Sequence, residues 1–247
     1  MYKKFLFLII IIIFFLSCKK EEDNFLQDMV ELDKAYMKTL LYIRDNNNTN
    51  RKSFIEHFII VWDSFKKKYY NSNPEDPQWK ADFDSLQDIL IRSHYYVATG
   101  EDESAGYFIL HDIKYVLSDL RRRNNINWFV DNLSAIYKVA FRLNELSKIY
   151  GLSGVVLTSE EEDRLLVVYS LLDRAVKKTI GEVDKSNIYL FKLHDSRLSA
   201  LKSNMNAISD LTHEIGKDIF QKRYSNLERM SNNILDLYFN TLQIIKD

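Results

Sequence analysis

Apolar residues recur along most of the chain at intervals of three and four positions. From residue 24 to residue 45, successive apolar positions are separated by 4, 3, 4, 4 and 3 residues, which places their side chains on one face of an α-helix. The same period predicts helices over about 50–70, 77–99, 104–123, 127–150 and 158–180, and two more between 187 and 246. We therefore expect an all-α fold, arranged as an antiparallel up-and-down helical bundle. The apolar face of the first predicted helix consists of Phe25, Met29, Leu32, Tyr36, Leu40 and Ile43.

Residues that favour helix N-termini support several of these starts. Asp76-Pro77 combines an N-cap residue with a proline at the first helical position. Thr158 and Glu161 have the spacing of a capping box, in which each side chain bonds the backbone N–H of the other residue. Asp184 and Ser186 offer a cap for the helix that follows. These positions predict where three of the helices begin.

Glycine and asparagine mark the predicted ends. Gly100 should stop the third helix, Asn124-Asn125 should break the chain after the fourth, and Gly151 should end the fifth as a left-handed cap. Gly216 is the expected break between the last two helices. We expect the inner face of the final helix to be formed by Phe220, Tyr224, Leu227, Ile234 and Leu237.

The composition supports helices and narrows the function. The chain of 247 residues has only 6 glycines and 2 prolines, whereas β-sandwiches need frequent turn residues and α/β enzymes need glycine-rich loops. The 34 Lys and Arg residues nearly balance 35 Asp and Glu residues, so we expect no nucleic-acid partner. The single cysteine, Cys18, excludes intrachain disulfides, cysteine-based zinc sites and iron–sulfur clusters. We therefore predict an all-helical protein that does not carry out nucleotide-dependent catalysis.

The two halves of the chain resemble each other weakly. With a shift of about 107 residues, Trp62 aligns with Tyr169, although identities are few and helical sequences imitate one another easily. A duplication predicts two tandem four-helix bundles over 25–124 and 125–247. The alternative is one continuous helical domain over 25–247.

The first residues have the pattern of a secretory signal. A short basic start precedes 12 uninterrupted apolar residues over 5–16, which as a helix rise about 18 Å and fall short of the roughly 30 Å bilayer core. We therefore interpret residues 1–17 as a signal peptide. The sequence Phe15-Leu16-Ser17-Cys18 resembles the lipobox of bacterial lipoproteins, with Phe15 in place of the usual leucine. The resemblance implies cleavage before Cys18 and a lipid anchor on it, with acyl chains such as palmitate.

Residues 18–24 follow as the lipidated cysteine and a charged tether. The run Lys19-Lys20-Glu21-Glu22-Asp23 resembles the export signal of surface-exposed lipoproteins. The alternative interpretation is a solvated linker between lipid and fold. The expected location is the bacterial outer membrane, with the helical part lipid-anchored at the periplasmic face or on the cell surface.

Histidine spacing gives little support for a metal centre. A di-iron bundle needs Glu-x-x-His pairs on two helices, because residues at i and i+3 present their side chains to one metal. Only Asp210 and His213 come close to this spacing. We expect neither a metal nor a cofactor, and if a metal binds, the candidate ligands are His57, His94, His111 and His213.

Motifs of the common catalytic classes are absent from the sequence. There is no Gly-x-Ser-x-Gly elbow, no glycine-rich phosphate loop and no His-Glu-x-x-His. Lys66-Lys67-Lys68 and Arg121-Arg122-Arg123 fall at predicted helix C-termini, where cations complement the helix dipole. Trp62, Trp79 and Trp128 are expected in the core. We therefore expect no catalytic residues.

One segment resembles a known group of bundles. Residues 105–141 contain a Leu-Arg-x-x-Asn turn, at Leu120 to Asn124, followed by an aromatic residue and Asp131. This resembles haem-less, cytochrome-c-prime-like four-helix-bundle proteins of the bacterial envelope. The pattern expects a histidine and a glutamate on the preceding helix, where this chain has Tyr107 and His111. The resemblance implies a bundle, with Asp131 capping the turn against Arg121 to Arg123.

These observations predict a membrane-anchored envelope lipoprotein whose helical part binds or scaffolds and does not catalyse. Its expected partners are the membrane, through the lipid, and an envelope protein or surface polymer. The alternative is a metal- or small-ligand-binding, cytochrome-like bundle that lacks covalent haem.

Overall fold

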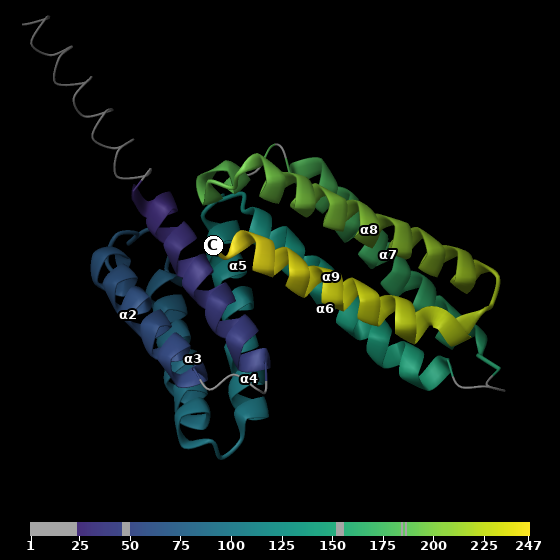
Figure 1. The fold of residues 1–247 in the computed structure, drawn as a ribbon, viewed down its shortest axis with the longest axis horizontal. Coiled ribbons are helices and arrows are strands. Elements are labelled where there is room, and N and C mark those ends of the chain that lie inside the picture. The colour runs from purple at the N-terminus through teal and green to yellow at the C-terminus, as the bar shows by residue number, and fades with distance from the viewer. Residues whose placement is uncertain (1–23, 46–49, 152–155, 184, 186) are drawn as a thin grey trace, which may run out of the picture.

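The computed structural model describes residues 24–45, 50–151, 156–183, 185 and 187–247. Every regular element in these ranges is helical, and the predicted all-α fold is confirmed (Figure 1). A helix over residues 24–44 comes first. It is followed by α2 (Arg51–Tyr69), α3 (Trp79–Thr99), α4 (Glu103–His111), α5 (Ile113–Arg123), α6 (Phe129–Tyr150), α7 (Ser159–Glu182), the 3₁₀ turn η1 (Asn187–Phe191), α8 (Asp195–Phe220), the 3₁₀ turn η2 (Tyr224–Asn226) and α9 (Leu227–Ile245).

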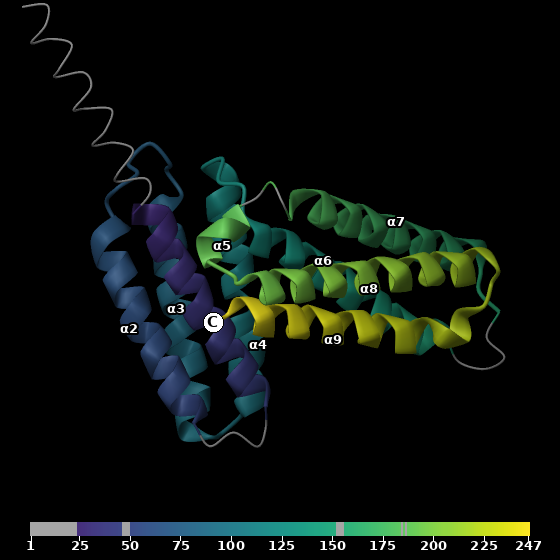
Figure 2. The same ribbon diagram turned by 45° about the horizontal axis from the view of Figure 1, so that its top comes forward.

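The helices pack as two antiparallel groups. The N-terminal group consists of the helix over 24–44 and α2 to α5, and the C-terminal group consists of α6 to α9. The long axes of the two groups are steeply inclined to each other, and they meet where α5 and the end of the 24–44 helix approach α6 and α9 (Figures 1 and 2). The buried apolar residues nevertheless form one cluster through both groups. The division into domains at 124/125 therefore stays a prediction.

The helix over residues 24–44 is the most enclosed of the N-terminal group. Its predicted apolar face is buried or half-buried, and further residues such as Val30, Asp33 and Met37 are buried as well. Its C-terminal end reaches the other group, where Arg44 pairs with Asp236 of α9 at 3.1 Å. The three tryptophans are in the core as predicted, with exposed fractions of 1 to 4%. This helix thus packs against its own bundle and also bridges to the next.

The predicted capping box at Thr158 and the predicted helix stop at Gly100 are confirmed, and the predicted left-handed cap at Gly151 is wrong. Thr158 and Glu161 form the reciprocal capping box at the start of α7, and Gly100 ends α3 in the left-handed region with φ 69°. Gly151 instead has φ −80°, in the right-handed region. Its N–H bonds the carbonyl of Ser147 at 2.7 Å, so the last turn of α6 closes without a left-handed residue.

The fourth predicted helix is two helices that meet at Asp112. The N–H of Asp112 bonds the carbonyl of Ile109 at 3.1 Å, and the N–H of Tyr115 bonds the carbonyl of Asp112 at 3.0 Å. Both are i to i+3 bonds of the tighter 3₁₀ type, which interrupt an α-helix without any glycine or proline. The apolar period does not register this interruption, because three-residue and four-residue steps both satisfy it.

The predicted break at Gly216 is wrong, because this glycine lies inside α8. A Cβ at Gly216 would overlap the ring of Tyr169 on α7, so the missing side chain permits close packing of the two helices. The chain leaves α8 after Phe220, where Lys222 takes φ 56°. Phe220 is 69% exposed and does not belong to the inner face of the last helix. The other members of that face are buried or half-buried, as predicted: Tyr224, Leu227, Ile234 and Leu237.

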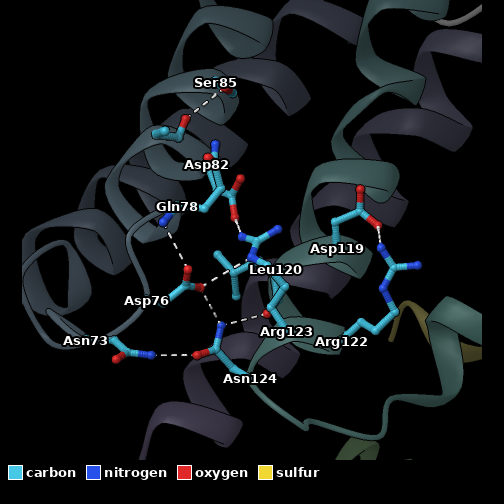
Figure 3. A network of polar contacts seen from close by, with 11 residues as sticks. Asn73, Asp76, Gln78, Asp82, Ser85, Asp119, Leu120, Arg122, Arg123 and Asn124 are labelled. Atoms are coloured by element: carbon cyan, nitrogen blue, oxygen red, sulfur yellow. Dashed lines mark hydrogen bonds and ion pairs between the residues drawn. The ribbon is translucent and has the colours of Figure 1, made fainter.

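The third helix starts at Trp79 and not at Pro77. Asp76 accepts a hydrogen bond from the N–H of Gln78 at 2.9 Å, and its other carboxylate oxygen accepts from Asn124 at 3.0 Å and from Arg123 at 3.4 Å (Figure 3). The carboxylate is therefore shared with the end of α5 and does not cap a helix that begins at the proline. This network fastens the loop before α3 to the break at Asn124-Asn125.

Several predictions fall outside the described residues. The signal peptide over 1–17, Cys18 and the tether, and the proposed caps Asp184 and Ser186 lie there. Among the described residues, no helix combines the length and the apolar character needed to cross a bilayer.

Candidate functional site

The four candidate metal ligands lie apart in the structure. His57 on α2 and His213 on α8 are exposed, and His94 on α3 lies 3.9 Å from the carboxylate of Glu56. His111, at the end of α4, is buried with 6% exposure. Within the described ranges, no group of three His, Cys, Asp or Glu residues is arranged to hold a metal ion.

A buried ion network lies where the two groups meet. The Arg121 guanidinium of α5 contacts both carboxylate oxygens of Asp33 at 3.2 and 3.0 Å, and it binds Asp131 of α6 in bidentate fashion at 3.0 and 2.5 Å. The indole N–H of Trp128 donates to Asp33 at 2.5 Å. The predicted contact of Asp131 with the arginine run is confirmed for Arg121. Arg122 pairs instead with Asp119 on the surface.

The charges of this network stabilise one another. Burial lowers the pKa of Arg121, but Asp131 and Asp33 outweigh that effect and raise it overall. Burial raises the pKa of Asp131 more than the guanidinium lowers it. Since Arg121 and Asp33 are each 1% exposed, these contacts are protected from screening by solvent. The network is therefore a structural joint between the two helical groups.

An open cavity of about 370 Å³ lies between α4, the start of α5 and α6. Two of its walls are exposed aromatic side chains, with Phe108 of α4 60% exposed and Phe141 of α6 42% exposed. Large exposed aromatic rings around a hollow are typical of binding sites. The lining residues are Phe108, Ile109, His111, Asp112, Tyr115, Tyr137 and Phe141.

Behind the cavity wall, His111 contacts a buried lysine. The Nζ atom of Lys114 lies 2.9 Å from Nδ1 of His111, and it also lies 3.5 Å from the ring centroid of Tyr137. The rings of His111 and Tyr137 stack at 5.0 Å with an interplanar angle of 18°. Lys114 is only 2% exposed. The 3₁₀ turn at Asp112 places His111 and Lys114 three residues apart on the same side of the chain.

The electrostatic setting favours the neutral forms of both side chains. Burial lowers the pKa of Lys114 to about 6, opposed by the carboxylate of Asp112. Burial, together with the charges of Lys114 and Arg44, holds the pKa of His111 well below its usual range. At neutral pH the imidazole is therefore uncharged, and the amine is mostly uncharged.

His111 has one ring nitrogen left to bind something else. Its Nδ1 is occupied by Lys114, whereas its Nε2 is buried and has no hydrogen-bond partner within the described part of the chain. A buried polar atom without a partner costs free energy, on the order of 1–3 kcal/mol. His111 is one of the residues that line the cavity. The arrangement is that of an aromatic-walled pocket with one polar anchor.

A larger cavity of about 610 Å³ lies at the end of the N-terminal group that faces away from α4. Phe25, Tyr69 and Trp79 form its apolar walls. None of its lining residues carries a buried, unpartnered polar side-chain atom. The cavity beside His111 is therefore the stronger candidate site.

The sequence could not locate this site. The sequence offers His111 only as a candidate metal ligand, and it assigns no role to Lys114. The one available signal was the placement of Lys114 between Ile113 and Leu117 on an apolar helix face. A lysine on such a face indicates burial, although it does not identify the partner.

Comparisons with known proteins give a limited likeness. An aspartate–tRNA ligase from Thermosipho melanesiensis (strain DSM 12029 / CIP 104789 / BI429) is 25% identical over 118 residues, which cover 47% of this chain. The match spans 20% of that ligase. No protein-family model and no solved structure matches the chain. The likeness is too partial to place the chain in a family.

Proposed function

We propose that this protein is a bacterial envelope lipoprotein, anchored to the outer membrane through lipid on Cys18, and that its helical part binds and does not catalyse. The anchor half of the proposal rests on the sequence: the basic start, the apolar run and the cysteine that follows it. Anchoring of this kind holds the helical part at the membrane surface. The bound partner is an envelope component or a small ligand.

The observation that carries the binding half is the cavity beside His111. It combines exposed aromatic walls, Phe108 and Phe141, with a buried ring nitrogen that lacks a partner. The Nδ1 atom of His111 contacts Lys114 and not a carboxylate. A catalytic histidine is usually oriented by a carboxylate and paired with a nucleophile. This chemistry supports binding over nucleophilic catalysis.

The metal-binding alternative has less support than small-ligand binding. The one buried candidate, His111, contacts Lys114 through its Nδ1 atom, and within the described residues no group of three His, Cys, Asp or Glu side chains is arranged to hold a metal with it. Small-ligand binding needs only the cavity and the free Nε2 atom.

Metabolic labelling tests the anchor. The full chain and its Cys18→Ala variant are expressed in a Gram-negative host with an alkyne-tagged palmitate, and the outer-membrane fraction is isolated. Because Cys18 is the only cysteine, no other thiol competes for the label. We expect label and outer-membrane recovery for the native chain and neither for the variant. An unlabelled native chain would contradict the anchor.

A fragment screen tests binding at the cavity. The Phe141→Glu variant places a charged side chain at the cavity mouth, and the control, Phe220→Glu, changes a more exposed phenylalanine at the end of α8. Thermal-shift hits against the full chain should disappear with Phe141→Glu and persist with Phe220→Glu. Hits that both variants retain would show that binding occurs elsewhere.

A further inference from the structure

The buried side of the cavity, here called its floor, has basic groups, whereas the acidic group of the cavity lies at its solvent-exposed edge. Lys114 lies behind His111, and Arg44 is close enough to lower the pKa of the imidazole. The carboxylate of Asp112 lines the cavity but is exposed to solvent, so water screens its charge. Within the described residues, no ion pair includes Lys114. The buried floor thus carries an amine that lacks a paired carboxylate.

The state of the histidine ring follows from the charge on Lys114. A protonated lysine has donors only, so in that state Nδ1 of His111 accepts its hydrogen bond at 2.9 Å. The ring proton then lies on Nε2, which is buried and has no hydrogen-bond partner within the described residues. A ligand oxygen on Nε2 would therefore complete a chain from Lys114 through His111 to the ligand.

We infer that the cavity binds a small organic carboxylate with an aromatic or apolar body, its carboxylate accepting from Nε2 of His111 and its body packing against Phe108 and Phe141. This inference rests on the proposed binding function and adds its chemical class. A carboxylate is favoured over a neutral acceptor because its charge compensates the buried lysine. A body with a ring is favoured because the cavity walls are phenylalanine and tyrosine.

Binding of an anion should be accompanied by uptake of a proton. The pKa of Lys114 is about 6 in the free protein, so near pH 7.5 the amine is mostly neutral. An anion on His111 favours the protonated amine and raises that pKa. Burial raises the pKa of the tyrosines that face this pair, so they stay neutral at that pH. The tyrosines are Tyr107, Tyr115, Tyr137 and Tyr238, and the charged groups that face the pair are Asp112 and Arg44.

Calorimetric titration of the lipidated full chain in nanodiscs tests the inference, with empty nanodiscs as the blank. The probes are phenylacetate, 3-phenylpropionate and 4-phenylbutyrate, each with its neutral amide of nearly the same shape. We expect at least one carboxylate to bind about tenfold or more tightly than its amide. Repeating the titration in buffers of different ionisation enthalpy should reveal uptake of part of a proton.

Two lysine variants distinguish the effect of the buried Lys114 amine from the effect of removing another amine nearby. Lys114→Met removes the buried amine, and the control Lys138→Met removes an exposed amine on α6 near the ring of Tyr115. We expect Lys114→Met to lose the preference for the carboxylate and the proton uptake, and Lys138→Met to keep both. Circular dichroism of both variants confirms that they are folded.

The outcomes distinguish this inference from the proposed function. If amides and carboxylates bind equally and Phe141→Glu abolishes both, the anion preference is wrong and the binding cavity stands. If no probe binds, the inference is wrong, and the fragment screen decides separately whether the cavity binds anything. Carboxylate binding that survives Phe141→Glu would also overturn the inference.

Discussion

The amine of Lys114 opposes folding because it is removed from water without a paired carboxylate. Its pKa is about 6 in the folded protein, against 10.5 for an ordinary lysine. Between these two pH values the unfolded chain binds more protons than the folded chain, so the free energy of unfolding rises with pH in that window and falls as pH is lowered towards 6. Lys114, at the floor of the candidate site, therefore lowers the free energy of unfolding of the native protein. Such a residue is more readily explained by ligand binding than by stability.

Replacing Lys114 by methionine should stabilise the protein. Methionine has a similar length and no charge to desolvate, so we expect a gain of about 1–4 kcal/mol at pH 7. The gain should shrink as pH is raised towards 10, because the amine of the unfolded native chain then loses its proton as well. Urea unfolding at pH 7 and pH 9.5 measures both effects. A loss of stability at pH 7, or a gain that does not change with pH, would contradict the lowered pKa.

At the scale of helices, most of the architecture could be predicted, and the errors share a cause. The apolar period located the helices and the capping box located the start of α7, because both depend on neighbours in sequence. The predictions for Gly216 and Asp76 are wrong because the partners of these residues are distant in sequence. Gly216 accommodates Tyr169 of α7, and Asp76 binds Arg123 and Asn124 at the end of α5. Patterns of neighbouring residues assign such residues a role within their own helix. Contacts with distant helices determine the role that they have in the fold.

Two glycine variants test this explanation. Gly216→Ala should destabilise the protein, because the new Cβ would overlap the Tyr169 ring. Gly181→Ala, in α7 with no neighbouring atom within 4 Å of a Cβ, should stabilise it by about 0.5–1 kcal/mol. Denaturant unfolding measures both. The Tyr169→Ala change should remove most of the penalty of Gly216→Ala, and equal effects of alanine at the two glycines would show that Tyr169 exerts no constraint.

At the scale of the whole molecule, the relation between the two helical groups depends on contacts that the sequence does not reveal. The pairing of Arg121 with Asp131 spans 10 positions and could be anticipated from the turn between them. Its pairing with Asp33 spans 88 positions and could not. The cavity beside His111 has the same origin, since α4 and α6 form it only once the groups are joined. The fold class was thus predictable, and the candidate site was not.

The buried joint should contribute far more to stability than the adjacent surface pair. Arg121→Met leaves Asp33 buried without its cation, and we expect a loss of about 3–5 kcal/mol. Arg122→Met removes an exposed ion pair with Asp119 and should cost less than about 1 kcal/mol. Thermal unfolding of these two variants compares neighbouring arginines directly. Similar losses for both would contradict the role assigned to the joint.

Photo-crosslinking on membranes tests the central claim, that the helical part binds through the cavity beside His111, most directly. A 3-phenylpropionate bearing a diazirine on its ring is irradiated with the full chain, and the labelled peptides are identified by mass spectrometry. The account predicts label on residues 107–115 and 137–141, removed by excess unmodified 3-phenylpropionate and by Phe141→Glu. Label elsewhere, or label that excess 3-phenylpropionate does not displace, would contradict it.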